Sequence, residues 1–221
     1  MSEVLPHITL DSGTAALHSI IWLHGLGADG EDFVPIVEQM TLPVPVRFIF
    51  PHAPMQPVTI NGGYVMRAWY DIAGNDIGAA QDGTGIRASQ ARIEAFIAVE
   101  VQRGIAPANI FLAGFSQGGA IVLHTGLRHA ARLGGLIALS TYLPLAESVR
   151  EEAHPDSAAT PIFMAHGRSD TVVPYDLGKK SAQLLESNGY MLDWQEYDMA
   201  HSVCMDEVRA IEAWLAQRLV S

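Results

Sequence analysis

The sequence predicts an α/β fold, in which helices cover both faces of a mostly parallel central sheet. Two observations predict it. Six short runs rich in β-forming residues alternate with longer stretches of helical spacing. Most of these runs are apolar almost throughout, which is typical of strands buried on both faces of a parallel sheet. We expect the strands at His18–Leu23, Val46–Phe50, Ile110–Ala113, Leu136–Leu139, Ile162–Ala165 and Asp193–Tyr197.

Four stretches between and after these strands are predicted to be helices. In the first and the last, apolar residues recur mostly at steps of three and four, which gives each stretch one apolar face. The first stretch is followed by Gly104, a residue type that commonly stops a helix. The expected helices are Gly85–Gln102, Gly118–Arg132, Tyr175–Ser187 and Val203–Leu219.

Two segments show no clear periodicity. Pro51–Gly85 is rich in glycine and proline, and loops of this length inside compact domains are often functional. Pro144–Pro161 is the second, and we expect one short helix in it. The chain shows no repeat or linker and its length suits one core, so residues 1–221 are expected to form a single domain.

Composition excludes several classes of protein. The formal net charge of -11 argues against nucleic acid as a partner and against anionic membrane surfaces. No run approaches the roughly 20 apolar residues of a membrane-spanning helix, so no stable membrane insertion is expected. The chain has one cysteine and its N-terminus does not resemble a signal peptide, so we expect a cytoplasmic protein.

The sequence GFSQGG at residues 114–119 follows a predicted strand and precedes a predicted helix. It fits the G-x-S-x-G pattern of a nucleophile elbow, a turn that holds a serine hydroxyl exposed at the edge of a sheet. The alternative is an ordinary tight turn, since glycine and serine are common in turns. In an elbow, Gly114 and Gly118 are required because side chains there would collide with the neighbouring strand or helix.

A serine nucleophile needs a base and an acid that orients the base, and both follow in the expected order. Asp170 lies in the loop after Ile162–Ala165, and His201 lies in the loop after Asp193–Tyr197. The carboxyl ends of parallel strands meet at one edge of the sheet, so we expect Ser116, Asp170 and His201 to converge.

Other interpretations exist for several of these polar residues. Asp170 could simply cap a helix, and Asp176 or Asp198 could replace it as the acid. Cys204 is expected to pack as a small apolar residue at the start of the last helix. His24 and His166 each precede a glycine at a strand end, where packing or turn stabilisation is expected. No metal-ligand spacing or phosphate-binding glycine loop is found, so no metal or other cofactor is expected.

Acyl transfer also needs donors for an oxyanion. The backbone amide of Gln117, directly after the nucleophile, would supply one donor. The loop His24–Gly27 after the first predicted strand would supply a second, because its glycines let the backbone bend towards the site.

Together these motifs resemble the carboxylesterase and acyl-protein thioesterase family of α/β-hydrolases. The resemblance extends over almost the whole chain and rests on HGLG at 24–27, FPHAP at 50–54, MRAWYD at 66–71, GFSQGG at 114–119, HGRSD at 166–170 and His201. It implies a cofactor-free serine hydrolase with Ser116 as nucleophile, His201 as base and Asp170 as orienting acid. It further implies the amides of Leu26 and Gln117 as the oxyanion hole, a cytosolic location and a possible homodimer.

Eukaryotic depalmitoylating members carry aspartate directly after HGLG and S-W-F-D at the third motif. This chain has Ala28 and Ala68-Trp69-Tyr70-Asp71 instead, so it resembles the bacterial carboxylesterase branch.

We therefore predict an esterase for short to medium acyl chains. The alternatives are a thioesterase or lysophospholipase on longer chains and, in a different class, a non-catalytic binding protein on a hydrolase scaffold. Part of Pro51–Gly85 is expected to form a wall of the acyl site; the alternative is that Trp69 only anchors this loop. The predicted substrate-binding residues are Met66, Trp69, Leu143 and Val172.

Overall fold

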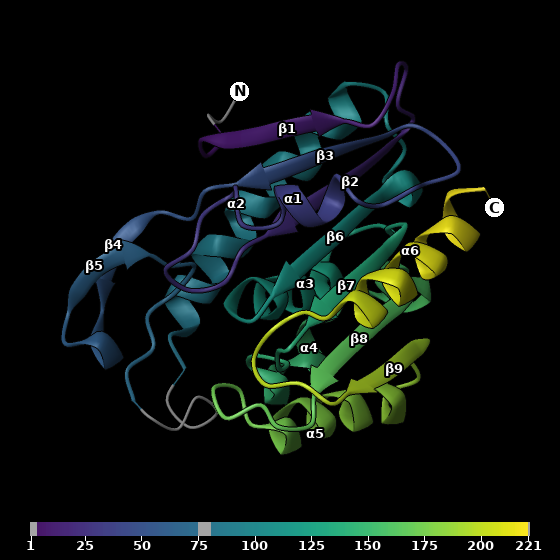
Figure 1. Ribbon diagram of the computed structural model, residues 1–221. Helices are drawn as coiled ribbons and strands as arrows, with labels where there is room; N and C mark the ends of the chain where they lie inside the picture. The colour runs from purple at the N-terminus through teal and green to yellow at the C-terminus, as the bar shows by residue number, and fades with distance from the viewer. Residues whose placement is uncertain (1–3, 75–80, 221) are drawn as a thin grey trace.

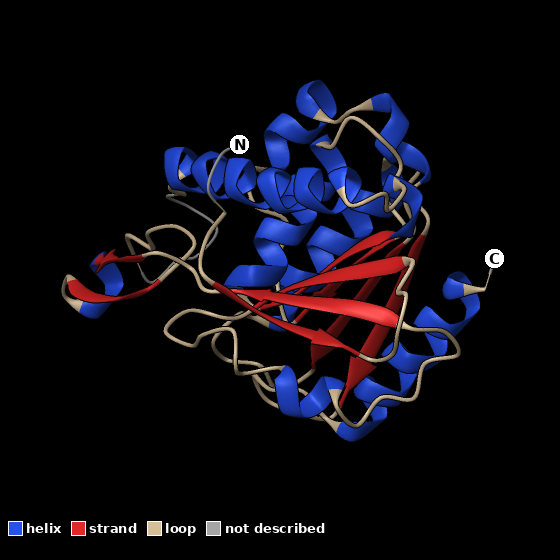
Figure 2. Cartoon of the chain, turned by 90° about the horizontal axis from the view of Figure 1, so that it is seen from above, coloured by secondary structure: helices blue, strands red, loops and turns tan. Residues whose placement is uncertain are grey.

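The computed structural model describes residues 4–74 and 81–220, which form a seven-stranded sheet with helices on both faces (Figure 1, Figure 2). The strand order is β1-β3-β2-β6-β7-β8-β9, and every neighbouring pair is parallel except β1 with β3. The strands are β1 His7–Asp11, β2 His18–Leu23, β3 Val46–Pro51, β6 Ile110–Phe115, β7 Gly135–Leu139, β8 Ile162–Gly167 and β9 Leu192–Tyr197. The predicted fold class is thus confirmed, and all six predicted strands are present with bounds that differ by at most two residues.

The helices divide between two apolar clusters, one on each face of the sheet. Side chains of α1 and α6 pack in one cluster, and those of α2, α3 and α5 pack in the other. The helices are α1 Val34–Val37, α2 Gly83–Gln102, α3 Gln117–Arg128, α4 Val149–Glu152, α5 Tyr175–Ser187 and α6 Met205–Leu219. Because the central strands are covered on both sides, they are buried almost throughout, as their continuous apolar sequences predict.

Three predicted helix ends are wrong by two residues or more. The first predicted helix, α2, begins at Gly83 instead of Gly85. The third helix α3 ends at Arg128 instead of Arg132, because the chain becomes extended at His129, whose ring meets Glu94 of α2 at 2.8 Å. The last helix α6 begins at Met205, with Cys204 as its N-cap. The second irregular segment does contain the short helix expected there, α4.

The interpretation of Pro51–Gly85 as an irregular loop is wrong for its middle part. Met55–Val58 (β4) and Tyr64–Arg67 (β5) pair as an antiparallel hairpin that projects from the body of the molecule (Figure 1). Gly62 and Gly63 turn the chain between them, both with positive φ. Each strand has four residues and is mostly exposed or half-buried. The alternation of apolar and polar residues is therefore too short to be recognised from the sequence.

Candidate active site

Ser116 occupies a sharp turn between β6 and α3. Its φ of 55° and ψ of -120° are unusual for a residue with a side chain, and such conformations persist only where the surroundings impose them. A Cβ atom at Gly114 would lie 2.6 Å from the backbone carbon of Gly118, and one at Gly118 would lie 2.6 Å from the carbonyl oxygen of His24. Both glycines are therefore required by close backbone contact, as expected for an elbow.

The three residues predicted to form a triad converge at the carboxyl ends of β6, β8 and β9. The Nε2 atom of His201 lies 2.9 Å from the Oγ of Ser116, and its Nδ1 lies 2.7 Å from Oδ2 of Asp170. The other carboxyl oxygen, Oδ1, accepts hydrogen bonds of 2.9 Å from the backbone amides of Val172 and Val173. A carboxylate can only accept, so the His201 proton sits on Nδ1 and leaves Nε2 free to accept from the serine.

The alternative acids lie elsewhere. Asp176 occupies the first turn of α5, where an acidic side chain complements the helix dipole. Asp198 is exposed and pairs with Arg168 at 2.7 Å. Cys204 is half-buried at the start of α6, and no contact between its thiol and Ser116 or His201 is found among the described residues.

The loop after β2 is fixed on both sides of Leu26. Its preceding residue, Gly25, accepts a hydrogen bond of 2.7 Å from Nδ1 of His24, and its following residue, Gly27, donates one of 2.9 Å to the carbonyl of Arg67 on β5. The His24 Nε2 accepts from the backbone amide of Ala53, so Nδ1 must carry the proton. Burial lowers the pKa of His24 to about 4, which keeps the ring in this neutral form.

The amides of Leu26 and Gln117 both border the space in front of Ser116. Within residues 4–74 and 81–220, neither amide donates a hydrogen bond to another protein group. Two unpaired backbone amides therefore belong to residues that line the cleft, and these are the two amides that the sequence predicts as oxyanion donors.

The Gln117 side chain has a role that the sequence analysis missed. Its Oε1 accepts from the backbone amide of Trp69 at 2.8 Å, and its Nε2 donates to the carbonyl of Tyr70 at 2.7 Å. The Trp69 indole is fully buried and donates to the carbonyl of His24 at 2.9 Å. The segment after β5 is thus held against both the elbow and the loop after β2.

A cleft of about 260 Å³ lies over the triad. Of the four predicted substrate-binding residues, only Val172 lines it; Trp69 and Leu143 are buried nearby, and the sulfur of Met66 faces Gly27. Tyr70 and Ile72 also line it, and both belong to Pro51–Gly85, part of which was expected to form this wall. Asp32, Phe115, Tyr142 and Val173 line the cleft without having been predicted as site residues. The full lining is Gly25, Leu26, Ala28, Asp32, Tyr70, Ile72, Phe115, Ser116, Gln117, Tyr142, Val172, Val173 and His201.

Two tyrosines form a polar pair in the mostly apolar wall of the cleft. The hydroxyls of Tyr70 and Tyr142 lie 2.9 Å apart, and burial raises the pKa of both. Both groups are therefore neutral, and each satisfies the other in a region with few polar partners.

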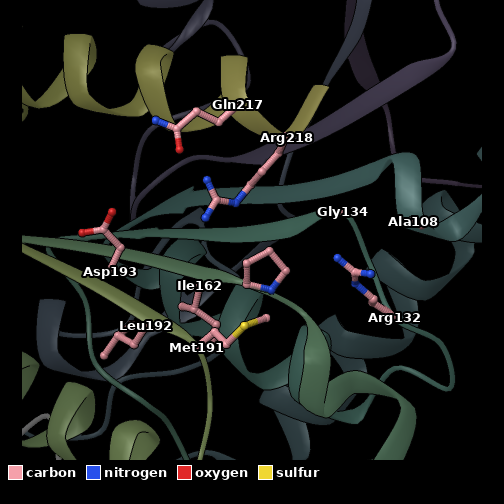
Figure 3. A pocket seen from close by; sticks show the side chains of 10 residues that line it. Ala108, Arg132, Gly134, Ile162, Met191, Leu192, Asp193, Gln217 and Arg218 are labelled. Carbon is pink, nitrogen blue, oxygen red and sulfur yellow. The ribbon is translucent and has the colours of Figure 1, made fainter. Parts of the chain in front are cut away.

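A larger hollow of about 490 Å³ opens at the opposite edge of the sheet, where β6 to β9 begin (Figure 3). Arg132, Asp193 and Arg218 lie around it, and it holds none of the triad residues. Within the part of the chain that the structure describes, no group of three His, Cys, Asp or Glu side chains could hold a metal ion. None of the helices described is both long and apolar enough to cross a membrane.

Comparisons with known proteins show the family to which the chain belongs. A family model described as Phospholipase/Carboxylesterase matches residues 9–219. Acyl-protein thioesterase 1 of Neurospora crassa is 42% identical over 212 residues, which cover 91% of this chain and 86% of that protein.

Two solved structures are also similar. The crystal structure of Arabidopsis thaliana SOBER1, a carboxylesterase, has a TM-score of 0.87 at 33% identity and covers 91% of this chain and 99% of its own. The crystal structure of Zea mays acyl-protein thioesterase 2 has a TM-score of 0.85 at 29% identity. The match covers 97% of this chain and 99% of the maize chain. These relatives are fungal and plant proteins, so the resemblance to a bacterial branch stays a prediction. The chain belongs to the phospholipase/carboxylesterase family of α/β-hydrolases and is a carboxylic ester hydrolase.

Proposed function

We propose that this enzyme cleaves esters of short to medium acyl chains through an acyl-enzyme intermediate on Ser116. The observation that carries the proposal is the hydrogen-bonded chain from the Ser116 Oγ through His201 to Asp170, at 2.9 and 2.7 Å, on the floor of a cleft. A non-catalytic scaffold would have no reason to maintain a strained serine in this arrangement.

In the proposed first step, the Ser116 Oγ attacks the ester carbonyl while Nε2 of His201 takes the hydroxyl proton. The carbonyl oxygen becomes an oxyanion that accepts from the amides of Leu26 and Gln117. The C–O bond to the alcohol then breaks, and His201 returns the proton to the departing alcohol. Asp170 stays ionised and stabilises the imidazolium that forms. Water repeats the sequence in the second half, which releases the carboxylic acid and restores Ser116.

The size and lining of the cleft support small acyl groups. Its volume of about 260 Å³ lies below the roughly 300–1,000 Å³ of pockets that enclose drug-sized ligands. Val172, Ile72 and Phe115 offer apolar contact to an acyl chain, while the Tyr70–Tyr142 pair closes part of the wall.

A thioesterase is the second candidate, because one similar protein carries the name acyl-protein thioesterase at 42% identity. A thioester would use the same triad, with a thiol as the leaving group. The cleft does not distinguish the two, since the leaving group would lie outside the acyl wall.

The test is a chain-length series of nitrophenyl esters and matching acyl thioesters, with kcat/KM measured for each. The proposal expects esters of short to medium length to give the highest values, and expects activity to fall at acidic pH, because protonated His201 cannot accept the serine proton. Higher values for long-chain thioesters would establish the second candidate instead.

A further inference from the structure

A second buried imidazole lies behind the triad. His166 is the residue before the last of β8, and its side chain is fully buried. Its Nε2 lies 2.9 Å from the carbonyl oxygen of Val173 and 3.4 Å from Oδ2 of Asp170. That carboxyl oxygen is the same one that accepts from His201.

The hydrogen-bond partners fix the protonation of this ring. The Val173 carbonyl can only accept, so Nε2 of His166 carries the proton. The Nδ1 atom has no hydrogen-bond partner among the described residues, so a proton there would be buried without an acceptor. Burial also lowers the pKa of His166. His166 is therefore a neutral donor and does not compete with His201 as a base.

Val173 links His166 to the carboxylate. Its amide donates to Oδ1 of Asp170 at 2.9 Å, and its carbonyl accepts from His166 at 2.9 Å. The turn that holds Asp170 is therefore hydrogen-bonded through both backbone groups of one residue, Val173. The N–H itself donates to Val173, but Nε2 lies only 3.4 Å from Oδ2, so the positive end of the ring dipole acts on the carboxylate through space.

The fold leaves a specific space for this ring. A Cβ atom at Gly178, on α5, would overlap Nδ1 of His166 and lie 2.6 Å from its Cε1. On the other side, the imidazole of His166 packs against the indole of Trp194 on β9. The two ring centroids lie 6.2 Å apart, and the ring planes are inclined at 30°. The imidazole is thus enclosed between α5 and β9 and has little freedom to turn its N–H away from Val173 and Asp170.

We propose that His166 is a positioning residue for ester hydrolysis, which holds Asp170 in the orientation that His201 requires and keeps a positive N–H dipole 3.4 Å from its Oδ2. This inference rests on the proposed function of Ser116, His201 and Asp170. His166 does not line the cleft, so its effect is on kcat and on the proton affinity of the catalytic base, and not on substrate binding.

The experiment compares His166→Phe with His166→Gln. Phenylalanine keeps a ring beside Trp194 but has no N–H, whereas the amide of glutamine can place an N–H near the position of Nε2. For His166→Phe we expect kcat to fall about tenfold, with KM unchanged. Without the N–H, Oδ2 attracts the proton of His201 more strongly, so the acid limb of kcat/KM moves to higher pH, by about half a unit. His166→Gln keeps most of the wild-type kcat and an acid limb of kcat/KM close to that of the wild type.

Gly178→Ala provides a second route if phenylalanine does not fit. It crowds the ring at Nδ1 and Cε1 without removing it, so Nε2 is displaced and the acid limb of kcat/KM moves from its wild-type position. The control is His124→Phe, a fully buried histidine on α3 whose Nε2 contacts Gln90. It lowers the melting temperature and leaves the acid limb unmoved.

The inference is overturned if folded His166→Phe keeps the wild-type kcat and acid limb, or if His166→Gln and His166→Phe change both equally. Ser116→Ala is measured in the same assay. Full activity in that variant would refute the proposed function itself, which is a different outcome from an inert His166.

Discussion

The two edges of the sheet hold two different hollows. At the carboxyl ends of the strands, a cleft of about 260 Å³ encloses Ser116 and His201, with buried Asp170 behind them. At the amino ends, a hollow of about 490 Å³ is bordered by Arg132 and Arg218. The larger space has no nucleophile and base in contact, so convergent polar side chains identify the site better than volume does.

Strand direction explains the difference. Apart from β3, which leads into the β4–β5 hairpin, each parallel strand leads into a helix. Helix N-termini and their unpaired amides therefore gather at the carboxyl edge. The elbow places Ser116 directly before α3, where Gln117 offers such an amide. The amino edge receives the ends of helices, including Arg218 at the end of α6, where a cation complements the helix dipole.

The largest expected effect separates the two edges directly. Ser116→Ala lowers kcat/KM by about four to six orders of magnitude, because the covalent step is lost and only binding and the oxyanion donors remain. Arg132→Gln, in the other hollow, changes it by less than about twofold. Steady-state kinetics with a nitrophenyl ester checks both, and a large loss in Arg132→Gln would place function at the amino edge as well.

The next effect concerns the two ends of α6. Glu207 lies in the first turn of α6 and is fully buried. Burial raises its pKa from an ordinary value of 4.5 to about 8, and a hydrogen bond from the Cys204 backbone acts in the opposite direction. The folded chain keeps this proton between those pH values while the unfolded chain loses it, so stability falls as pH rises through that range. Glu207→Gln removes this fall and is more stable than wild type at pH 8 by a few kcal/mol.

Melting temperatures from pH 5 to pH 9 test this. The control is Arg218→Gln at the other end of the helix, where the guanidinium lies 3.8 Å from the Trp214 ring centroid. Arginine stays charged throughout this range, so its loss lowers the melting temperature by a similar amount at each pH. If the melting temperatures of wild type and Glu207→Gln changed in parallel from pH 5 to pH 9, the buried Glu207 would not cause the fall in stability.

A smaller effect is expected from the Gln117 side chain, which anchors the backbone of Trp69 and Tyr70. Gln117→Ala leaves the amide of Trp69 and the carbonyl of Tyr70 buried without their partner, which costs about 1–3 kcal/mol of stability. It also lowers kcat/KM, because Tyr70 lines the cleft. Gln195→Ala is the matched control, since the hydrogen bond of that side chain goes to Asp193 on its own strand. The free energy of unfolding is measured in urea for both variants. Equal values for Gln117→Ala and Gln195→Ala would show that the Gln117 side chain does not anchor this segment.

The smallest effect tests how far the acyl wall extends. Val172 lines the cleft, so Val172→Ala reduces the gain per added substrate methylene, which is about 0.8 kcal/mol or fourfold in rate when the methylene is buried. Met66→Ala leaves the chain-length profile unchanged, because Met66 lies against Gly27 outside the lining. A shifted optimum in Met66→Ala would extend the wall to the β4–β5 hairpin.

The elbow was predictable because its G-x-S-x-G pattern is local in the sequence. Gly114 is needed by a contact within the strand–turn–helix unit and Gly118 by one with the end of β2, while Asp170 and His201 follow strands that the sequence predicts. The positions of these residues at one edge then follow from parallel pairing alone. The single-domain interpretation of residues 1–221, the cytoplasmic location and the homodimer stay predictions.

The cleft walls could not be predicted in the same way. Tyr70 and Tyr142 meet only after α2, β6, α3 and β7 have packed, so no local pattern relates them. His166 matches a packing or turn-stabilising role from sequence alone, and its contact with Asp170 depends on how the turn to Val173 closes. The edge strand β1 was missed because its alternation of exposed and half-buried residues is short.

The most direct test of the central claim is to locate the adduct of a fluorophosphonate probe by mass spectrometry. Such a probe reacts with a serine only where a base activates it and donors stabilise the phosphoryl oxygen. The account predicts one adduct per chain, on Ser116, absent in Ser116→Ala and slowed at acidic pH as His201 becomes protonated. An adduct on any other residue, or labelling that persists in Ser116→Ala, would contradict it.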